Sequence, residues 1–82
     1  MKRIAWADQA KNDICGLDRS TSMRILHALH RFAESGAGDV KSLLGGVEEF
    51  RPRAGDYRLF FVFTGDEVIE VRRVRHRREA YR

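Results

Sequence analysis

A pair of apolar runs joined by a short turn constrains the fold more than any other feature of this 82-residue chain. Residues 57–64, YRLFFVFT, place alternate side chains on two faces, and residues 68–74, VIEVRRV, do the same after the turn GDE at 65–67. Alternation with a period of two is typical of strands, and a glycine-containing turn between two such runs predicts a β-hairpin. We therefore expect an antiparallel sheet in the C-terminal half.

Two other stretches predict strands that complete this sheet. Residues 2–6, KRIAW, mix apolar and polar side chains at a period of two. Residues 47–53, VEEFRPR, form another strand, and Pro52 places it at a sheet edge or close to its own end. Residues 40–46, VKSLLGG, predict a loop whose two leucines form an apolar plug.

Residues 8–35 show the periodicity of two helices. The first begins at Asp8, a possible cap, and ends near Gly16. The second begins in the capping stretch 18–22 and runs to about Ser35. The side chains Met23, Leu26, His30 and Ala33 form one stripe along it, with Ile25, Leu29 and Phe32 beside them.

The order of these elements is β-α-α-β-β-β. It predicts one α+β domain over residues 1–82, with a helical hairpin packed on a mostly antiparallel sheet of about four strands. A chain of this length buries only roughly 60–65% of its unfolded surface, so the core should be small.

The basic residues are unevenly distributed. Residues 1–50 contain seven Lys/Arg and seven Asp/Glu, whereas residues 51–82 contain nine Arg and five Asp/Glu, which accounts for the net charge of +4. Guanidinium groups bind phosphate in a bidentate manner and stack on bases. A basic patch on a small domain is typical of nucleic-acid binding, although composition alone favours a solubilising surface equally.

Several classes of protein and site are disfavoured. No apolar run approaches the roughly 18 residues of a membrane span, and the N-terminal stretch lacks the apolar core of a secretion signal. The single cysteine, Cys15, has no internal disulfide partner, so we expect the reducing cytoplasm. His27 and His30 lack further ligands at metal-binding spacing, and we expect neither a metal nor a cofactor.

The arginines of the C-terminal half are expected to meet on one surface. Arg51 and Arg53 share one side of their strand, and Arg58 opens the next strand of the hairpin. Four others leave the last strand: Arg72, Arg73, Arg75 and Arg77. No acidic partner is evident among them, and converging like charges are best explained by an anionic ligand.

These segments resemble the RelE/ParE superfamily of bacterial toxins, the toxin halves of type II toxin–antitoxin pairs. The resemblance covers nearly the whole chain and depends chiefly on GDYRLFFVF at 55–63 and VIEVRRVRHRREAY at 68–81. It implies the RelE-like fold and a cognate antitoxin that presents an acidic segment within a toxin–antitoxin hetero-oligomer. RelE-like members are ribosome-dependent endoribonucleases that cut mRNA, whereas ParE-like members inhibit DNA gyrase and lack the nuclease residues.

The resemblance favours the RelE branch. RelE-like toxins place basic side chains on the strand before the YR turn, an arginine in that turn, another after the last strand, and a tyrosine near the C-terminus. The matching positions here are Arg51 and Arg53, Arg58, Arg77 and Tyr81, with His76 preceding Arg77. The chain departs from well-known relatives in carrying arginine where they carry lysine. Arginine does not lose its proton in proteins, which disfavours a general base at Arg51.

The reaction that the resemblance implies is transesterification, in which the RNA 2′-OH attacks the adjacent phosphate and the 5′-oxygen leaves. We expect Arg58 and Arg77 to bind the scissile phosphate. Tyr81 would stack on a base or donate a proton. The remaining arginines are expected to bind RNA, with ribosomal RNA and mRNA as targets: Arg51, Arg53, Arg72, Arg73 and Arg75.

The proton acceptor is left open at this point. His76 is the candidate near the arginines whose unperturbed pKa, roughly 6.5, suits the task. Glu48, Glu49 and a group of the ribosome are the alternatives. Two other functions also stay open: gyrase inhibition without catalysis, and a degenerate toxin that keeps only antitoxin binding.

Overall fold

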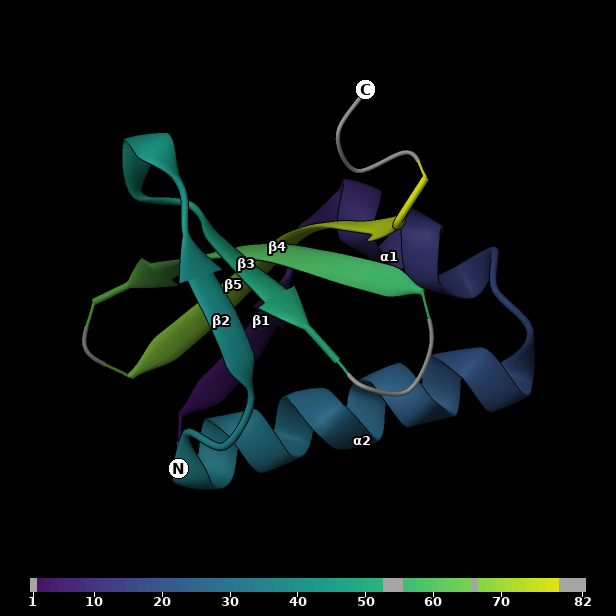
Figure 1. The fold of residues 1–82 in the computed structure, drawn as a ribbon, viewed down its shortest axis with the longest axis horizontal. Coiled ribbons are helices and arrows are strands. Elements are labelled where there is room, and N and C mark those ends of the chain that lie inside the picture. Colours follow the sequence, from purple (N-terminus) through teal and green to yellow (C-terminus); the bar gives the residue numbers. More distant parts are fainter. Residues whose placement is uncertain (1, 53–55, 66, 79–82) are drawn as a thin grey trace.

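Five strands form a single sheet within the residues that the computed structural model describes, which are 2–52, 56–65 and 67–78. The elements in chain order are β1 (Arg3–Trp6), α1 (Asp8–Cys15), α2 (Arg19–Ser35), β2 (Asp39–Ser42), the 3₁₀ turn η1 (Leu44–Gly46), β3 (Glu48–Arg51), β4 (Tyr57–Thr64) and β5 (Val68–His76). The strands lie in the spatial order β1-β5-β4-β3-β2 (Figure 1). Strand β1 pairs in parallel with β5, and the other neighbours are antiparallel.

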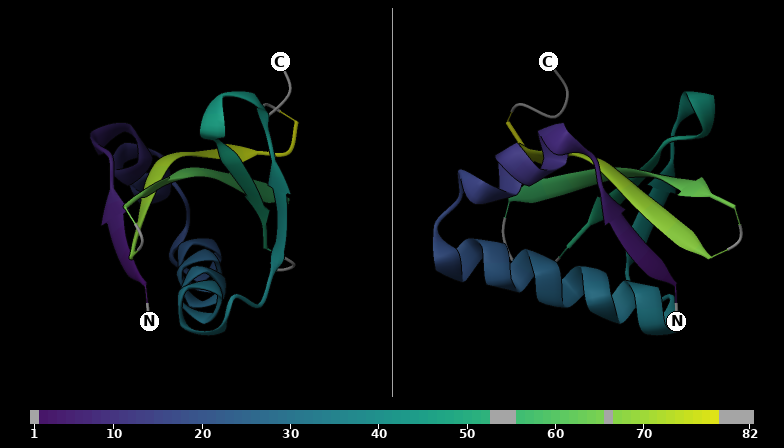
Figure 2. Two further views of the ribbon diagram at one scale, coloured as in Figure 1. Left: turned by 90° about the vertical axis from the view of Figure 1, so that its left-hand side faces the viewer. Right: turned by 180° about the vertical axis from the view of Figure 1, so that it is seen from behind.

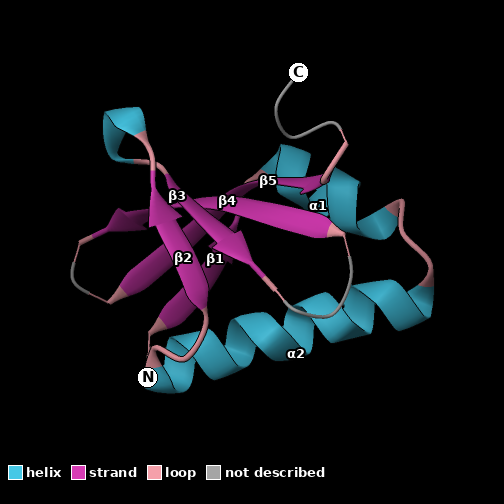
Figure 3. Cartoon of the chain, in the orientation of Figure 1, coloured by secondary structure: helices cyan, strands magenta, loops and turns pink. Residues whose placement is uncertain are grey.

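The predicted hairpin is the centre of this sheet (Figure 3). Strand β4 has the predicted bounds, and β5 continues past the predicted end at residue 74 to His76. Strand β3 pairs with the free side of β4, and β1 pairs with the free side of β5. The prediction of an α+β domain with two helices on a mostly antiparallel sheet is confirmed.

The additional strand is β2, which lies in a stretch predicted to be a loop. Its four residues are mostly exposed and polar, so they lack the apolar alternation that identifies a strand. Backbone pairing with β3 forms the strand instead. The expected apolar plug is wrong for Leu44, which is 97% exposed in η1, whereas Leu43 is half-buried.

Both helices begin and end close to the predicted residues. Ala7 and not Asp8 is the N-cap of α1, and Asp8 lies in the first turn, where an acid suits the helix dipole. The carboxylate of Asp18 caps α2 by accepting a hydrogen bond from the Thr21 N–H at 3.1 Å. Gly36 ends α2 with φ 74°, a left-handed conformation that favours glycine.

The core lies between α2 and one face of the sheet, as the two views of Figure 2 show. The stripe of α2 that faces the sheet differs from the predicted one, since Met23 is 56% exposed and His30 is exposed. The Phe32 ring stacks on Phe50 of β3 with 5.3 Å between centroids. The buried apolar residues are Ala10, Ile25, Leu29, Ala33, Phe50, Leu59, Phe61, Ile69, Val71 and Val74.

Candidate functional site

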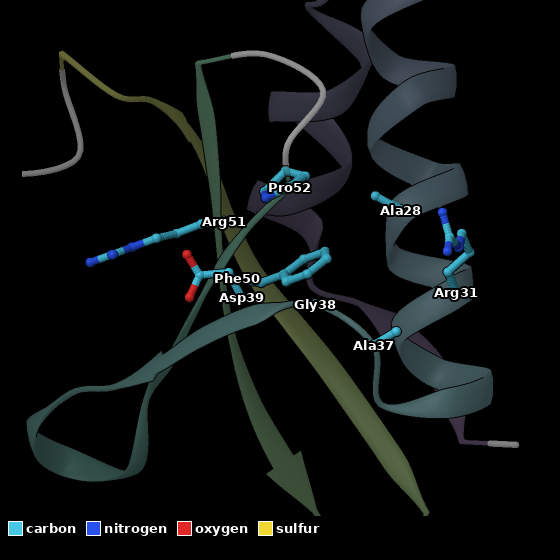
Figure 4. A pocket seen from close by; sticks show the side chains of 8 residues that line it. All are labelled: Ala28, Arg31, Ala37, Gly38, Asp39, Phe50, Arg51 and Pro52. Atoms are coloured by element: carbon cyan, nitrogen blue, oxygen red, sulfur yellow. The ribbon is translucent and has the colours of Figure 1, made fainter.

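The face of the sheet that points away from α2 carries arginines from three adjacent strands. Neighbouring residues in a strand point to opposite faces, so Arg51 lies opposite the buried Phe50, and Arg58 opposite the buried Leu59. In Figure 4, Phe50 points toward α2 whereas Arg51 points away from it. We call this surface the arginine face and define it by Arg51 of β3, Arg58 of β4, and Arg73 and Arg75 of β5.

A β-bulge brings the two β5 arginines to this face. Phe60 pairs with Arg73, but the next β4 residue, Phe61, pairs with Val71, which leaves Arg72 without an opposite residue in β4. The buried positions of β5 are Ile69, Val71 and Val74, so the spacing changes from two residues to three across the bulge. Strict alternation would have put Arg73 on the core face with Val71. The bulge reverses that orientation.

Cross-strand pairing brings the arginines close together. Arg58 and Arg75 are direct partners in the β4–β5 ladder. One step beyond the Phe50–Leu59 pair, the antiparallel register brings Arg51 beside Arg58. Like charges that lie directly opposite destabilise a sheet, so this row favours an anion above it.

The guanidinium of Arg58 is partly buried. Its Nη1 donates a hydrogen bond to its neighbouring carbonyl oxygen, that of Tyr57, at 3.0 Å. Its Nε is buried and has no hydrogen-bond partner in the part of the chain that the structure describes. A buried cationic donor without an acceptor is costly.

A buried carboxylate lies on the same face. Glu49 precedes Phe50 in β3 and pairs across the ladder with Phe60, so its side chain lies among the arginines. Its side chain is 1% exposed, and its Oε1 lies 3.2 Å from Nη2 of Arg51. Glu48 lies on the core side of β3 and accepts a hydrogen bond from the Ser42 hydroxyl at 3.0 Å.

Other arginines also have acidic neighbours, so the expectation that the cluster lacks acidic partners is wrong. Arg72 forms an ion pair with Glu70. Arg77 donates its backbone N–H to the Asp56 carbonyl oxygen at 2.5 Å, and its Nη1 lies 4.0 Å from the Asp56 carboxylate. This contact holds Arg77 beside Asp56, the residue before β4.

The partner of Arg73 comes from α1. The Nε of Arg73 donates to Oδ2 of Asp13 at 3.2 Å, and the Val74 N–H donates to the same oxygen at 2.9 Å. Burial would raise the pKa of Asp13, but the hydrogen bonds from Val74, Gln9 and Arg73 outweigh it and lower that pKa. Sequence reasoning missed Asp13, because nothing near it in the chain indicates a partner in β5.

His76 lies on the other face of the sheet. It pairs with Tyr57 in the β4–β5 ladder, and the two rings meet edge to face with 5.2 Å between centroids. Its Nδ1 accepts a hydrogen bond from the Arg78 N–H at 3.1 Å. It is therefore separated by the sheet from Arg58 and Arg75. The predicted site residues Arg53 and Tyr81 lie outside the described residues.

A pocket of about 520 Å³ lies beside the arginine face, between α2 and the ends of β2 and β3 (Figure 4). Gly38 lines this pocket beside Phe50, and a Cβ added at Gly38 would lie 2.6 Å from Phe50 Cε1.

In the described part of the chain, no group of three or more His, Cys, Asp or Glu is placed to hold a metal ion. No described helix combines the length and apolar character needed to cross a membrane.

The fold and the site together define a small α+β domain with arginines clustered on one face of its sheet. The family model of the ParE toxin of the type II toxin–antitoxin system parDE matches residues 4–81. The chain therefore belongs to this family of toxins and is the toxin of a type II toxin–antitoxin system. No curated protein matches the sequence.

Solved structures of toxin–antitoxin complexes share the fold. The RelB–RelE complex of Methanococcus jannaschii matches with TM-score 0.72 and 23% identity, over 94% of each chain. The E. coli RelBE complex matches with TM-score 0.73 and 18% identity, over 90% of this chain and 94% of that one. The RelE–RelB complex of Pyrococcus horikoshii matches with TM-score 0.72 and 23% identity, over 96% and 98%.

Proposed function

We propose that this toxin cuts mRNA on the ribosome and that the arginine face binds the RNA backbone. The observation that carries the proposal is the opposed pair Arg58 and Arg75, flanked by Arg51, on three neighbouring strands. An RNA phosphate would offset the repulsion within this row.

The proposed reaction is the transesterification of the RelE branch. The ribose 2′-oxygen forms a bond to the adjacent phosphorus, and the bond from phosphorus to the 5′-oxygen breaks. A base takes the 2′-OH proton, and the leaving 5′-oxygen receives a proton. Charge accumulates on the phosphate oxygens during this step, and guanidinium groups fixed in place beforehand stabilise it.

We assign roles to the side chains on this basis. Arg58 and Arg77 contact the scissile phosphate, since the Asp56 contact holds Arg77 next to the start of β4. Tyr81 orients the substrate. The side chains that bind the rest of the RNA are Arg51, Arg53, Arg72, Arg73 and Arg75.

Proton transfer is assigned to His76 or to a group of the ribosome. His76 lies at the end of the sheet, where β5 stops, and RNA would have to bend around that end to reach its imidazole. Glu49 is a poor base because its side chain is 1% exposed and is ion-paired with Arg51. Its role is to neutralise part of the charge beneath the arginines.

An antitoxin is the expected partner, as in the solved complexes of the three relatives. We propose that it presents an acidic segment to the basic half of the chain, forming a hetero-oligomer and competing with RNA. Ribosome and mRNA are the proposed targets, which places the toxin in the cytoplasm.

Gyrase inhibition without catalysis is the second candidate, and the match to the ParE family model favours it. In that case the arginine face would bind a protein or the DNA held by gyrase. The two functions differ in a simple readout, because a nuclease arrests translation whereas a gyrase inhibitor stops DNA supercoiling.

A reconstituted translation system with a reporter mRNA tests the proposal. Primer extension would locate cuts after adding the wild type, Arg58→Ala, or the control Arg24→Ala, whose exposed arginine lies on α2. We expect the wild type and the control to cut within codons, and we expect these cuts to be lost in Arg58→Ala. Intact mRNA with the wild type would contradict the proposal, and a gyrase supercoiling assay would then test the second candidate.

A further inference from the structure

Asp13 of α1 connects a helix to the arginine face at the point where β5 changes register. Its side chain is 14% exposed, and both of its oxygens accept hydrogen bonds. Oδ2 accepts from Arg73 and Val74, and Oδ1 accepts from Gln9 at 2.9 Å. A carboxylate that binds three donors on two elements is held rigidly.

This contact lies where β5 no longer has a neighbouring strand on its α1 side. Strand β1 pairs with β5 only as far as Val71. The carbonyl oxygen of Val71 accepts the Ala7 N–H at 2.9 Å. Beyond that residue, β5 has β4 on one side and α1 on the other. The Val74 N–H faces α1, and the Asp13 carboxylate accepts it where a continuing strand would have supplied a carbonyl.

The bulge lies between these two hydrogen bonds. The Val71 carbonyl oxygen is bound by Ala7, just after β1, the Val74 N–H is bound by Asp13, and the extra residue Arg72 lies between them. A bulge disrupts the ladder locally and persists when the displaced backbone groups find other partners. Asp13 supplies such a partner and also pairs with Arg73, the first residue that the bulge turns to the arginine face.

We propose that Asp13 is a positioning residue for the proposed RNA cleavage. It holds the bulge of β5 in the register that presents Arg73 and Arg75 beside Arg58. The contact uses the inner Nε of Arg73 and not its two terminal nitrogens, which can therefore still bind a phosphate. This inference rests on the proposed function for its effect on activity, but its structural part can be tested without it.

The structural part is tested by NMR on the full chain. Asp13→Asn keeps an acceptor oxygen for Val74 but removes the charge, Asp13→Ala removes both, and Asp8→Asn is the control on the exposed side of α1. Faster hydrogen exchange of the Val74 amide and a shifted Arg73 Nε–H resonance are expected in the Ala variant. A smaller change is expected in the Asn variant and none in the control. Unchanged Val74 protection in both Asp13 variants would overturn the inference, whatever the activity.

The functional part is tested by a double-mutant cycle on mRNA cleavage. Asp13→Asn is expected to lower kcat roughly 10- to 100-fold, as misplacement of a binding group by about 1 Å does. In an Arg73→Ala background the same substitution should lower kcat far less, because its effect passes through Arg73. Equal effects in both backgrounds, or full activity of both Asp13 variants, would overturn the positioning role. Absence of cleavage by the wild type would instead contradict the proposed function and leave the NMR result to decide on Asp13.

Discussion

The two faces of the central hairpin carry the same strands but opposite chemistry. On the core face, Leu59 and Phe61 are fully buried under α2. On the arginine face, their neighbours Arg58 and Phe60 are only partly buried. Alternate residues of one strand therefore form the core on one side and the proposed RNA-binding surface on the other.

The two faces also differ in how closely like charges lie to one another. The buried cluster on the core face is apolar, and its energy rises with the area buried. The arginine face holds like charges in adjacent rows, offset in part by the buried Glu49 and by Asp13. Substitutions on the core face should therefore mainly lower stability, whereas substitutions of the arginines should mainly lower the proposed activity.

The largest effect is expected on the core face. Phe61→Ala removes a fully buried ring and should lower the free energy of unfolding by about 3–5 kcal/mol. Phe60→Ala, one residue away on the arginine face, should lower it by less than half of that amount. Urea denaturation measures the free energy of unfolding of both variants. Equal losses would contradict the proposed difference between the two faces.

The next effect is expected in activity and not in stability. Arg58→Ala should lower kcat for mRNA cleavage about 10²- to 10³-fold, as removal of one transition-state donor does. The urea midpoint should stay close to that of the wild type, because the change also removes a buried donor without a partner. Unchanged cleavage by Arg58→Ala would show that this face does not hold the reacting phosphate.

A smaller effect is expected from the buried acid of the arginine face. Glu49→Gln keeps the shape of the side chain but removes its negative charge from beneath Arg51, at a cost of about 1–3 kcal/mol in unfolding free energy. Affinity for the proposed acidic segment of the antitoxin should rise, since the face becomes more positive. Calorimetry of antitoxin binding measures this change, and weaker binding would indicate that Glu49 orients the arginines and does not only neutralise them.

The smallest effect is a pH dependence. The pKa of Asp13 is lowered in the folded state, so its contribution to stability is complete above the ordinary aspartate pKa of roughly 3.9 and is lost as the pH falls through the folded value. The stability difference between the wild type and Asp13→Asn should therefore shrink between about pH 5 and pH 3. Denaturant midpoints at the two pH values measure it, and a constant difference would show that the Asp13 charge contributes nothing.

Much of the fold could be predicted because its signals are local. The hairpin strands, the two helices and their ends follow from alternation, capping residues and glycines within a few positions of each element. Strand β2 could not be found in this way, because its polar residues form a strand only through pairing with β3. The exposed Met23 and Leu44 were misplaced for a related reason, since periodicity does not tell which apolar side chains a neighbour will cover.

The candidate site was predicted in part. The concentration of arginines identified the region, and Arg51 and Arg58 do converge. Alternation alone would have placed Arg73 and Arg75 against α2, because the bulge has no signature in the residues around Arg72. The buried Glu49, the contact of Asp13 and the separation of His76 from the arginines are likewise products of pairing between distant segments.

The sequence by itself therefore determined the class of fold, the toxin family and the side chains available to bind an anion. These depend on short-range patterns and on the identity of residues. Only the tertiary structure decided which arginines share a face and which acids accompany them. The physical reason is that one extra residue in β5 reverses the direction of the side chains that follow it, and the acceptor that holds the first of them lies 60 positions away in the chain.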